Sequence, residues 1–279
     1  KKTKVLLLGG RGSLGRAILS KLKLEKNIIV KNLTRKEGDV ATDINKVFNQ
    51  ISRFKPNYIL NCIASNGINY CEENQKEAFD VNSIFPFKIS NFIKKKIKLI
   101  HFSTEAVFEG NLYKKIYNEN SLPCPTTVYG ISKYFGELAV LKNTSSIVIR
   151  LPLLFGPTHT QQIVSKLVNQ IKKNKKVYVS KDVYSTPVYS PSVADYVVRM
   201  IRKNIFLHPQ RLKSRLIHLS SKQYLSLYDL IYVIAKKLKK EDLIIPAQDK
   251  KFNLGWNKPR FLGLNSIHFK TVLKINKKT

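Results

Sequence analysis

The sequence predicts an α/β fold of the Rossmann type, a doubly wound parallel sheet with a smaller C-terminal lobe. Three observations predict it. Short apolar runs alternate with helical periodicity through the first 151 residues, and a glycine-rich turn, Gly9-Gly-Arg-Gly-Ser-Leu-Gly15, directly follows the first apolar run. A Tyr-x-x-x-Lys sequence, Tyr129-Gly-Ile-Ser-Lys133, opens the last helical segment of this half. Strands separated by helices imply right-handed crossovers and a sheet covered on both faces.

Each element of the first half is predicted from its periodicity and its flanking residues. The buried strands, taken in order, are expected at Val5–Leu8, Ile28–Val30, Tyr58–Cys62, Lys98–Phe102 and Ser146–Leu151. The helices between them are expected at about Leu14–Lys23, and at Ile44–Phe54, Ala78–Lys95 and Val128–Leu141. We therefore expect residues 1–151 to form a dinucleotide-binding, NAD(P)-type domain.

The second half, residues 152–279, has a different texture, because prolines interrupt it repeatedly. Helices are expected at Ile163–Lys172, Ser192–Ile201 and Leu227–Lys240, and short strands at Val177–Val179 and Leu216–Leu219. The last thirty or so residues are expected to be irregular. We expect this half to form a substrate-binding lobe, some segments of which return to the main sheet.

The formal net charge of +32 has two interpretations. Such a field attracts polyanions such as nucleic acid or anionic membranes. Lysine greatly exceeds arginine, however, and Asn and Ile are abundant, as expected from an AT-rich genome. The chain also lacks a nucleic-acid reading motif. We favour codon bias, and we expect no nucleic-acid partner.

Location is predicted from what the sequence lacks. No apolar run approaches the ~20 residues that span a bilayer, and the charged start lacks the apolar region of a signal peptide. The three cysteines, Cys62, Cys71 and Cys124, are odd in number and lack metal-ligand spacing. We expect a soluble cytoplasmic protein with reduced thiols, no bound metal and no membrane association.

The glycine turn predicts a dinucleotide site. Gly9, Gly12 and Gly15 allow a tight turn, close approach of the backbone to a pyrophosphate and close packing of helix on strand. The free N–H groups of the helix N-terminus then face the phosphates. The remaining residues expected to contact the cofactor here are Arg11, Ser13 and Leu14.

The segment after the second strand predicts which dinucleotide binds. NAD-selective sites place an acid here, but Val30–Lys36 contains no carboxylate. Arg11 and Arg35 can instead face a 2′-phosphate, because a guanidinium fork suits that group. We favour NADPH over NADH. Asp43, followed by Ile44, is a candidate contact for the adenine, although an Asp at a helix start also serves as an N-cap.

The reacting group is predicted from three side chains. A free tyrosine has a pKa of about 10, too high for a ready proton shuttle at neutral pH. A lysine one helical turn later lies on the same helix face, so Lys133 is expected to stabilise the phenolate of Tyr129. Thr104, after the strand Lys98–Phe102, is expected to hydrogen-bond the substrate oxygen and Tyr129. We also expect Cys62, Ala64 and Asn82 to line the cofactor pocket.

These residues resemble the extended short-chain dehydrogenase/reductases, and within them the dTDP-4-dehydrorhamnose reductase branch of sugar-nucleotide reductases. The likeness covers nearly the whole chain. Its carriers are Gly9–Gly15, Lys55–Asn61, Asn82, Ser103–Gly110, Tyr129–Lys133 with Gly136-Glu137, and, more weakly, Arg150–Gly156, Tyr184–Pro187, Ala194-Asp195 and Lys258–Asn265. The resemblance implies NAD(P)H-dependent reduction of a 4-keto sugar nucleotide for surface polysaccharide, with Thr104, Tyr129 and Lys133 in the catalytic places. It also implies a homodimer formed through the helices Ala78–Lys95 and Val128–Leu141.

Departures from relatives narrow the chemistry. The related dehydratases place an Asp-Glu pair after the catalytic Thr, and the fucose-type epimerase-reductases place a Cys there, whereas this chain has Glu105 and Ala106. Simple hydride transfer remains. Rhamnose reductases typically carry an aromatic at position 106 and a Trp at position 153, which is Leu here. The segment Arg150–Gly156 looks more like the regulatory β-subunit of methionine adenosyltransferase, so an NADP-binding regulatory subunit without turnover is the alternative.

Candidate substrate contacts are the residues that the motifs bring toward the expected cleft. They are Glu105, Ala106, Leu153, His159, Pro187 and Arg260.

Overall fold

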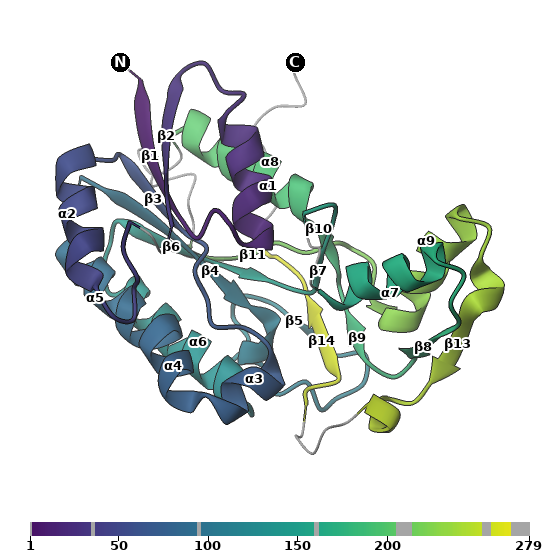
Figure 1. The fold of residues 1–279 in the computed structure, drawn as a ribbon. Helices are drawn as coiled ribbons and strands as arrows, with labels where there is room; N and C mark the ends of the chain where they lie inside the picture. Colours follow the sequence, from purple (N-terminus) through teal and green to yellow (C-terminus); the bar gives the residue numbers. More distant parts are fainter. Residues whose placement is uncertain are drawn as a thin grey trace.

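Six parallel strands form the central sheet, in the order β11-β6-β4-β3-β1-β2 (Figure 1). This computed structural model describes residues 2–34, 37–93, 96–158, 162–204, 214–252 and 258–268. The strands are β1 (Thr3–Leu8), β2 (Ile28–Leu33), β3 (Tyr58–Asn61), β4 (Lys98–Thr104), β6 (Ser146–Leu151) and β11 (Leu216–His218). Strand β2 lies on one side of β1, and β3, the next strand of this sheet along the chain, lies on the other. The strand order therefore reverses at β1, which is where proteins of this fold class bind their ligands.

Two groups of helices cover the two faces of this sheet. One face buries an apolar cluster under α1 (Ser13–Leu22) and α8 (Ser190–Arg202). The other face is covered by α2 (Ile44–Phe54), α5 (Phe85–Phe92) and α6 (Val128–Leu141). The inner strands β3, β4 and β6 are buried on both faces, as their near-continuous apolar runs predict, whereas the edge strand β2 is mostly half-buried. The Rossmann-type prediction is confirmed.

The helix expected at Ala78–Lys95 is instead interrupted. It consists of α4 (Gln75–Phe79), a π-helical turn at Asp80–Ile84 and then α5, and a short α3 (Ile68–Glu73) precedes it. Pro86 explains the interruption, because it has no N–H to donate to the carbonyl of Asn82 four residues earlier. That carbonyl faces Gly136 of α6, where an added Cβ would lie 2.1 Å from it. Gly136 therefore lets α6 pack closely against the π turn.

The second half of the chain contributes to both lobes. α8 packs against α1, and β11 pairs with β6, so segments from this half return to the main sheet. The smaller lobe contains α7 (Ile163–Lys172), α9 (Leu227–Lys237) and the parallel pair β8 (Val177–Ser180) and β13 (Ile244–Ala247). Helix α9 ends three residues before the predicted Lys240.

Short strands join the two lobes. β5 (Ile116–Tyr117), β14 (Phe261–Leu264), β9 (Tyr184–Ser185) and β12 (Leu225–Ser226) form one small sheet, and β7 (Leu154–Phe155) pairs with β10 (Val188–Tyr189). The expectation that the last thirty residues are irregular is therefore wrong for β14. Its apolar sequence Phe-Leu-Gly-Leu pairs in parallel with both β9 and β5, an arrangement that local sequence does not signal.

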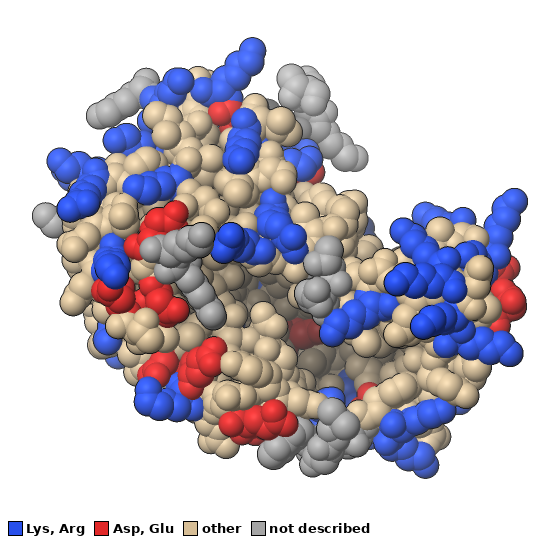
Figure 2. All heavy atoms as spheres, viewed as in Figure 1, with Lys and Arg blue, Asp and Glu red and all other residues tan. Residues whose placement is uncertain are grey.

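The surface is hollowed between the lobes on the face shown in Figure 2, where lysines and arginines gather over the smaller lobe. Acidic side chains on this face lie mainly over the larger lobe. Among the described helices, all are too short or too polar to cross a membrane.

Candidate active site

The glycine turn joins β1 to α1 with its backbone folded tightly on itself. The Gly12 N–H donates to the Gly9 carbonyl at 3.0 Å, and Gly9 has a φ of 80°. A Cβ at Gly15 would lie 2.2 Å from the same Gly9 carbonyl oxygen, so only glycine fits there. Ser13 and Leu14 form the first turn of α1, and Leu14 packs against the core. This turn brings the helix N-terminus to the carboxyl edge of the sheet.

A cavity of about 870 Å³ opens at this edge. Residues predicted to contact the cofactor that line it are Gly9, Arg11, Gly12, Cys62 and Ala64. The volume lies in the range of cofactor and ligand pockets. A glycine turn that excludes any Cβ, a helix N-terminus and an arginine suit a dinucleotide diphosphate, so the residues present fit this cofactor.

The loop after β2 contains a carboxylate that the sequence analysis did not use. Glu37 accepts hydrogen bonds from the Thr34 N–H, at 2.8 Å, and from the Thr34 hydroxyl. These bonds, and the positive charge of Arg11, lower the pKa of Glu37. Glu37 is thus tied back into its own loop, while Thr34 and Arg11 line the cavity. Arg35 lies outside the described residues.

Asp43 and Ile44 are not among the residues that line this cavity. The Asp43 carboxylate accepts from the Lys46 N–H and pairs with the Lys46 ammonium at 2.7 Å, as the N-cap of α2. Asp39 and Val40 line the cavity instead. The alternative N-cap interpretation of Asp43 therefore describes its contacts. The sequence feature that could have indicated Asp39 as a cavity residue is its position directly after Gly38, in the loop that follows the second strand.

Thr104 and Tyr129 meet where β4 ends and α6 begins. Thr104 is the last residue of β4, and its side chain hydrogen-bonds the Tyr129 phenol. The Thr104 hydroxyl oxygen also accepts from the Ala106 N–H at 3.2 Å. Thr127 caps α6 by accepting from the Gly130 N–H, which fixes where Tyr129 starts the helix. The hydroxyls of Thr104 and Tyr129, both predicted to be catalytic, are therefore adjacent.

The charge state of the phenol differs from the sequence expectation. Burial, together with the charges of Cys71 and Glu105, raises the pKa of Tyr129 to about 12, while the Thr104 hydrogen bond opposes this shift. Lys133 was expected to favour the phenolate, but its Nζ donates to the Phe102 carbonyl at 2.7 Å. Desolvation of the phenol therefore prevails. Tyr129 is held protonated, as a proton donor must be.

Lys133 is itself buried, with 2% of its surface exposed. Burial lowers its pKa to about 8, and the negative charge of Glu137 one turn later opposes that shift. Cys62, at the cavity wall, lies close enough for its charge to affect the same pKa.

Asn82 is fully buried in the π turn and holds the polypeptide around the site. Its Oδ1 accepts from the Ser65 N–H at 3.0 Å, and its Nδ2 donates to the Ser65 carbonyl and to the Ser132 hydroxyl. Ser65 lines the cavity, and Ser132 precedes Lys133 on α6. Asn82 therefore connects the cavity wall to the helix that carries Tyr129 and Lys133.

Glu105 links the large lobe to the small one. Its carboxylate accepts from the Ser185 hydroxyl at 2.7 Å and from the Leu153 N–H at 3.1 Å. Burial raises the pKa of Glu105 to about 8. Ala106, 5% exposed, follows it in a 3₁₀ turn that packs under Gly130 of α6. Glu105, Ala106 and Leu153 thus lie together next to Thr104.

The other candidate substrate contacts are more scattered. Pro187 lines a second cavity, of about 540 Å³, between β10, α8 and the loop before β12. Arg260 is half-exposed, pairs with Asp182 at 3.7 Å and lies over the Phe261 ring. His159 lies outside the described residues.

A Tyr-x-x-x-Lys helix that faces a threonine at the end of a parallel strand, beside a glycine turn, is typical of one class of nucleotide-dependent oxidoreductases. This protein is an extended short-chain dehydrogenase/reductase in fold and in the arrangement of these side chains. It belongs to the family described as "RmlD substrate binding domain", whose model matches residues 3–279.

Similar proteins extend over nearly the whole chain. A dTDP-4-dehydrorhamnose reductase of Aggregatibacter actinomycetemcomitans is 28% identical over 83% of this chain and 78% of its own. The methionine adenosyltransferase 2 subunit beta of Danio rerio is 25% identical over 92% of this chain and 81% of its own. The crystal structure of a dTDP-4-dehydrorhamnose reductase from Yersinia enterocolitica superposes with a TM-score of 0.85 at 26% identity, covering 98% and 93% of the two chains. The suspected family is confirmed.

Proposed function

We propose that this protein is an NADPH-dependent reductase of a 4-keto deoxysugar nucleotide, working in nucleotide-sugar synthesis for surface polysaccharide. One observation carries the proposal: the half-buried Tyr129 hydrogen-bonds Thr104 through its phenol, near a glycine-cradled cavity. Relatives described as dTDP-4-dehydrorhamnose reductase and as dTDP-4-keto-6-deoxy-D-glucose reductase support the substrate class.

The chain's own side chains divide the work of reduction. Bound NADPH supplies the hydride. Thr104 orients the keto oxygen, and Tyr129, protonated at neutral pH, gives its proton to the alkoxide that develops there. Lys133 holds a positive charge at the same helix face, which favours the phenolate left behind. Gly9, Gly12 and the α1 N-terminus hold the diphosphate, and Arg11 binds the 2′-phosphate.

The test is turnover with defined substrates. NADPH oxidation is measured at 340 nm with a panel of 4-keto-6-deoxy nucleotide sugars that differ in base and in sugar configuration. We expect turnover with at least one of them, with NADPH preferred over NADH. If the panel gives no turnover while NADPH binds, and the kinetics of a methionine adenosyltransferase change on addition of the protein, the regulatory function is correct instead.

We further propose a homodimer formed through α5 and α6. Large apolar side chains lie exposed on these helices and the adjoining π turn, with Ile84, Phe87, Phe135 and Leu138 between 44% and 50% exposed. Exposed apolar side chains on two helices that pack together favour association with a second copy. Light scattering after size exclusion tests it: Phe135→Glu should give monomers, whereas Val233→Glu on α9 should leave the dimer intact. A wild-type monomer would contradict the proposal.

We place the protein in the cytoplasm. Its three cysteines are all unpaired, at Cys62, Cys71 and Cys124, which suits a reducing compartment. Fractionation of cells that express the natural protein, followed by immunoblotting, tests the location.

A further inference from the structure

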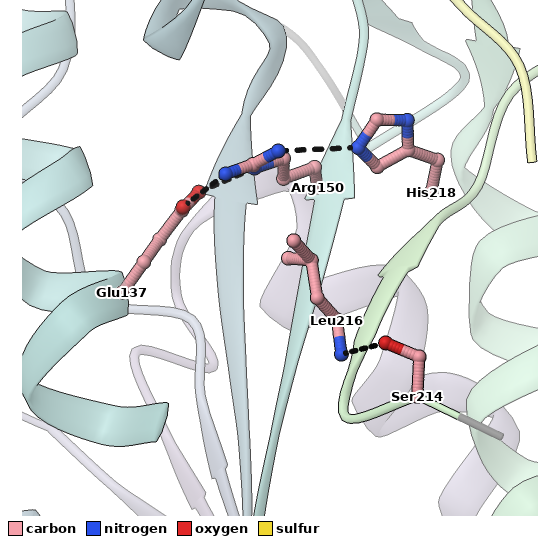
Figure 3. Close-up of polar contacts among 5 residues, drawn as sticks. All are labelled: Glu137, Arg150, Ser214, Leu216 and His218. Carbon is pink, nitrogen blue, oxygen red and sulfur yellow. Dashed lines mark hydrogen bonds and ion pairs between the residues drawn. The ribbon is translucent and has the colours of Figure 1, made fainter. Parts of the chain in front are cut away.

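Glu137 and Arg150 form a buried ion pair beside the helix that carries Tyr129 and Lys133 (Figure 3). The guanidinium is bidentate, with Nε 2.9 Å from Oε1 and Nη2 2.7 Å from Oε2 of Glu137. The two side chains are only 1% and 2% exposed. Bidentate geometry of this kind is directional as well as strong, so it fixes the carboxylate in one orientation.

The pair lies one helical turn from the lysine of the site. Tyr129, Lys133 and Glu137 are spaced four residues apart on α6 and therefore share a face. In the main sheet Arg150 of β6 is paired with Ser103 of β4, the neighbour of Phe102. Because the Phe102 carbonyl accepts from Lys133, α6 is fixed to β4 through the lysine and to β6 through Glu137.

Arg150 is held from its other side by a neutral histidine. His218 Nδ1 lies 3.0 Å from the Asn265 carbonyl, which can only accept, so Nδ1 carries the hydrogen and Nε2 is free to accept from Arg150 at 3.4 Å (Figure 3). Burial lowers the pKa of His218 to about 4, and the charge of Arg150 contributes to this shift. The guanidinium also lies 5.0 Å from the centre of the Phe108 ring. Arg150 thus keeps its positive charge in contact with Glu137.

Fold stability alone gives little reason for such a pair. Two desolvated charges rarely stabilise a core more than well-packed apolar residues of similar size would. The nearby lysine supplies a reason, because burial favours the neutral amine of Lys133. Three titratable groups have charges that affect the pKa of Lys133: Glu137, Cys62 and Cys71. The charge of Lys133 in turn affects the pKa of a fourth group, His101.

Of these groups, Glu137 is the one held in an ion pair, and it supplies the negative charge. Burial raises the pKa of both thiols, Cys62 and Cys71, and lowers the pKa of His101 well below its usual value, so these three groups are neutral. The Glu137 carboxylate is therefore the charge that opposes loss of the proton from Lys133.

We propose that Glu137 and Arg150 are positioning residues for the reduction: Arg150 pairs with Glu137 and holds it in place, and Glu137 keeps the Lys133 ammonium charged at the Phe102 carbonyl. This inference rests on the proposed function in so far as Lys133 serves the reaction. Neither residue touches the substrate. Both act through the lysine.

The test measures the charge of Lys133 directly. Protein labelled with ¹³C at the lysine ε-carbons is titrated by NMR, and the Lys133 signal is identified by its loss in Lys133→Met. We expect a midpoint of about 8 in the wild type. In Glu137→Gln, which keeps the shape, it should fall by about one pH unit, because the opposing charge is gone. In Arg150→Met it should fall as well, because an unpaired buried carboxylate takes up a proton.

Val140→Ala is the matched control, since Val140 is fully buried one turn further along α6. It should lower the melting temperature without moving the Lys133 midpoint. If the single charge variants do not fold, the double variant Glu137→Gln with Arg150→Met replaces the pair without an unpaired charge, and its midpoint should be lowered equally.

A midpoint in Glu137→Gln that stays within about 0.3 pH units of the wild type, with a lowered melting temperature, would show a merely structural pair and overturn the inference. The outcome is independent of turnover. If wild-type protein reduces no keto sugar but the midpoint moves, the proposed function fails alone. If turnover occurs and the midpoint is unmoved, the inference fails alone.

Discussion

The cofactor side and the substrate side of the cleft are built in different ways. On the cofactor side, main-chain groups set the geometry: the turn closes on the Gly9 carbonyl, and the Asn82 side-chain amide bonds the N–H and the carbonyl of Ser65. On the substrate side, side chains from elements far apart in the sequence contact each other, as in the Glu105–Ser185 hydrogen bond and the Arg260–Asp182 ion pair.

This difference distinguishes the residues proposed to hold the cofactor from the residues proposed to select the substrate. A backbone-built turn accepts few substitutions, because any Cβ at Gly15 meets the Gly9 carbonyl. The substrate side can change one side chain at a time, and here it has Ala106 and Leu153 where the resemblance leads us to expect aromatic residues. We therefore propose that the first side sets cofactor binding and that the second side selects the sugar.

The largest expected effect is a loss of turnover that leaves cofactor binding intact. Tyr129→Phe removes the proton donor but keeps the ring, so kcat should fall about 1,000-fold, within the range for general acid catalysis. NADPH affinity, measured by fluorescence, should stay within about threefold, a difference below 1 kcal/mol. Tyr134→Phe is the control, because Tyr134 lies on the same helix but packs in a separate apolar cluster. Unchanged turnover in Tyr129→Phe would remove the proposed acid.

The second-largest expected effect is a loss of NADPH affinity. Gly15→Ala places a Cβ 2.2 Å from the Gly9 carbonyl, so the turn must open. Overpacking typically costs about 1–3 kcal/mol, and we expect NADPH affinity to fall about 100-fold by calorimetry. Ser20→Ala, on the exposed face of the same helix, should have no effect. Equal affinity in Gly15→Ala would mean that this turn does not hold the diphosphate.

The two sides also differ in how far the sequence predicts them. The glycine turn, Thr104, Tyr129 and Lys133 are local patterns, and their elements are formed where periodicity places them. The partners of Lys133 and Glu105 come from strands far along the chain, so only the sheet register reveals them. The raised pKa of Tyr129 is likewise a property of burial, which spacing along a helix does not give.

A smaller effect sharpens the choice of cofactor. Arg11 lines the cavity close to Glu37, and it is the described side chain proposed to bind a 2′-phosphate. Arg11→Ala should lower the preference for NADPH over NADH about tenfold in kcat/KM, the worth of one charge-assisted contact. Arg16→Ala is the control, because Arg16 donates to the Thr158 carbonyl at 2.8 Å. If both variants keep the wild-type preference, another residue distinguishes the two cofactors.

The smallest expected effect concerns the contact that joins the two sides. Burial raises the pKa of Glu105 from 4.5 to about 8 in the folded protein, so the folded state keeps a proton that the unfolded chain has lost between these pH values. The stability from this proton is complete below pH 4.5 and is lost as pH rises through 8. Glu105→Gln imitates the protonated form. It should match the wild type near pH 4.5 and exceed it at pH 8.5 by about 1 kcal/mol, a value discounted because water reaches part of the carboxyl.

Urea unfolding at both pH values measures the free energy of unfolding of wild type and Glu105→Gln. Asp242→Asn is the control for the loss of an exposed carboxylate. The sign of the difference is the decisive result. A variant that is less stable than the wild type at pH 8.5 would mean that Glu105 is ionised when it accepts from Ser185 and Leu153. In that case a charged carboxylate, and not a neutral acid, connects the lobes beside Thr104 at neutral pH, and the substrate side carries a negative charge into the cleft.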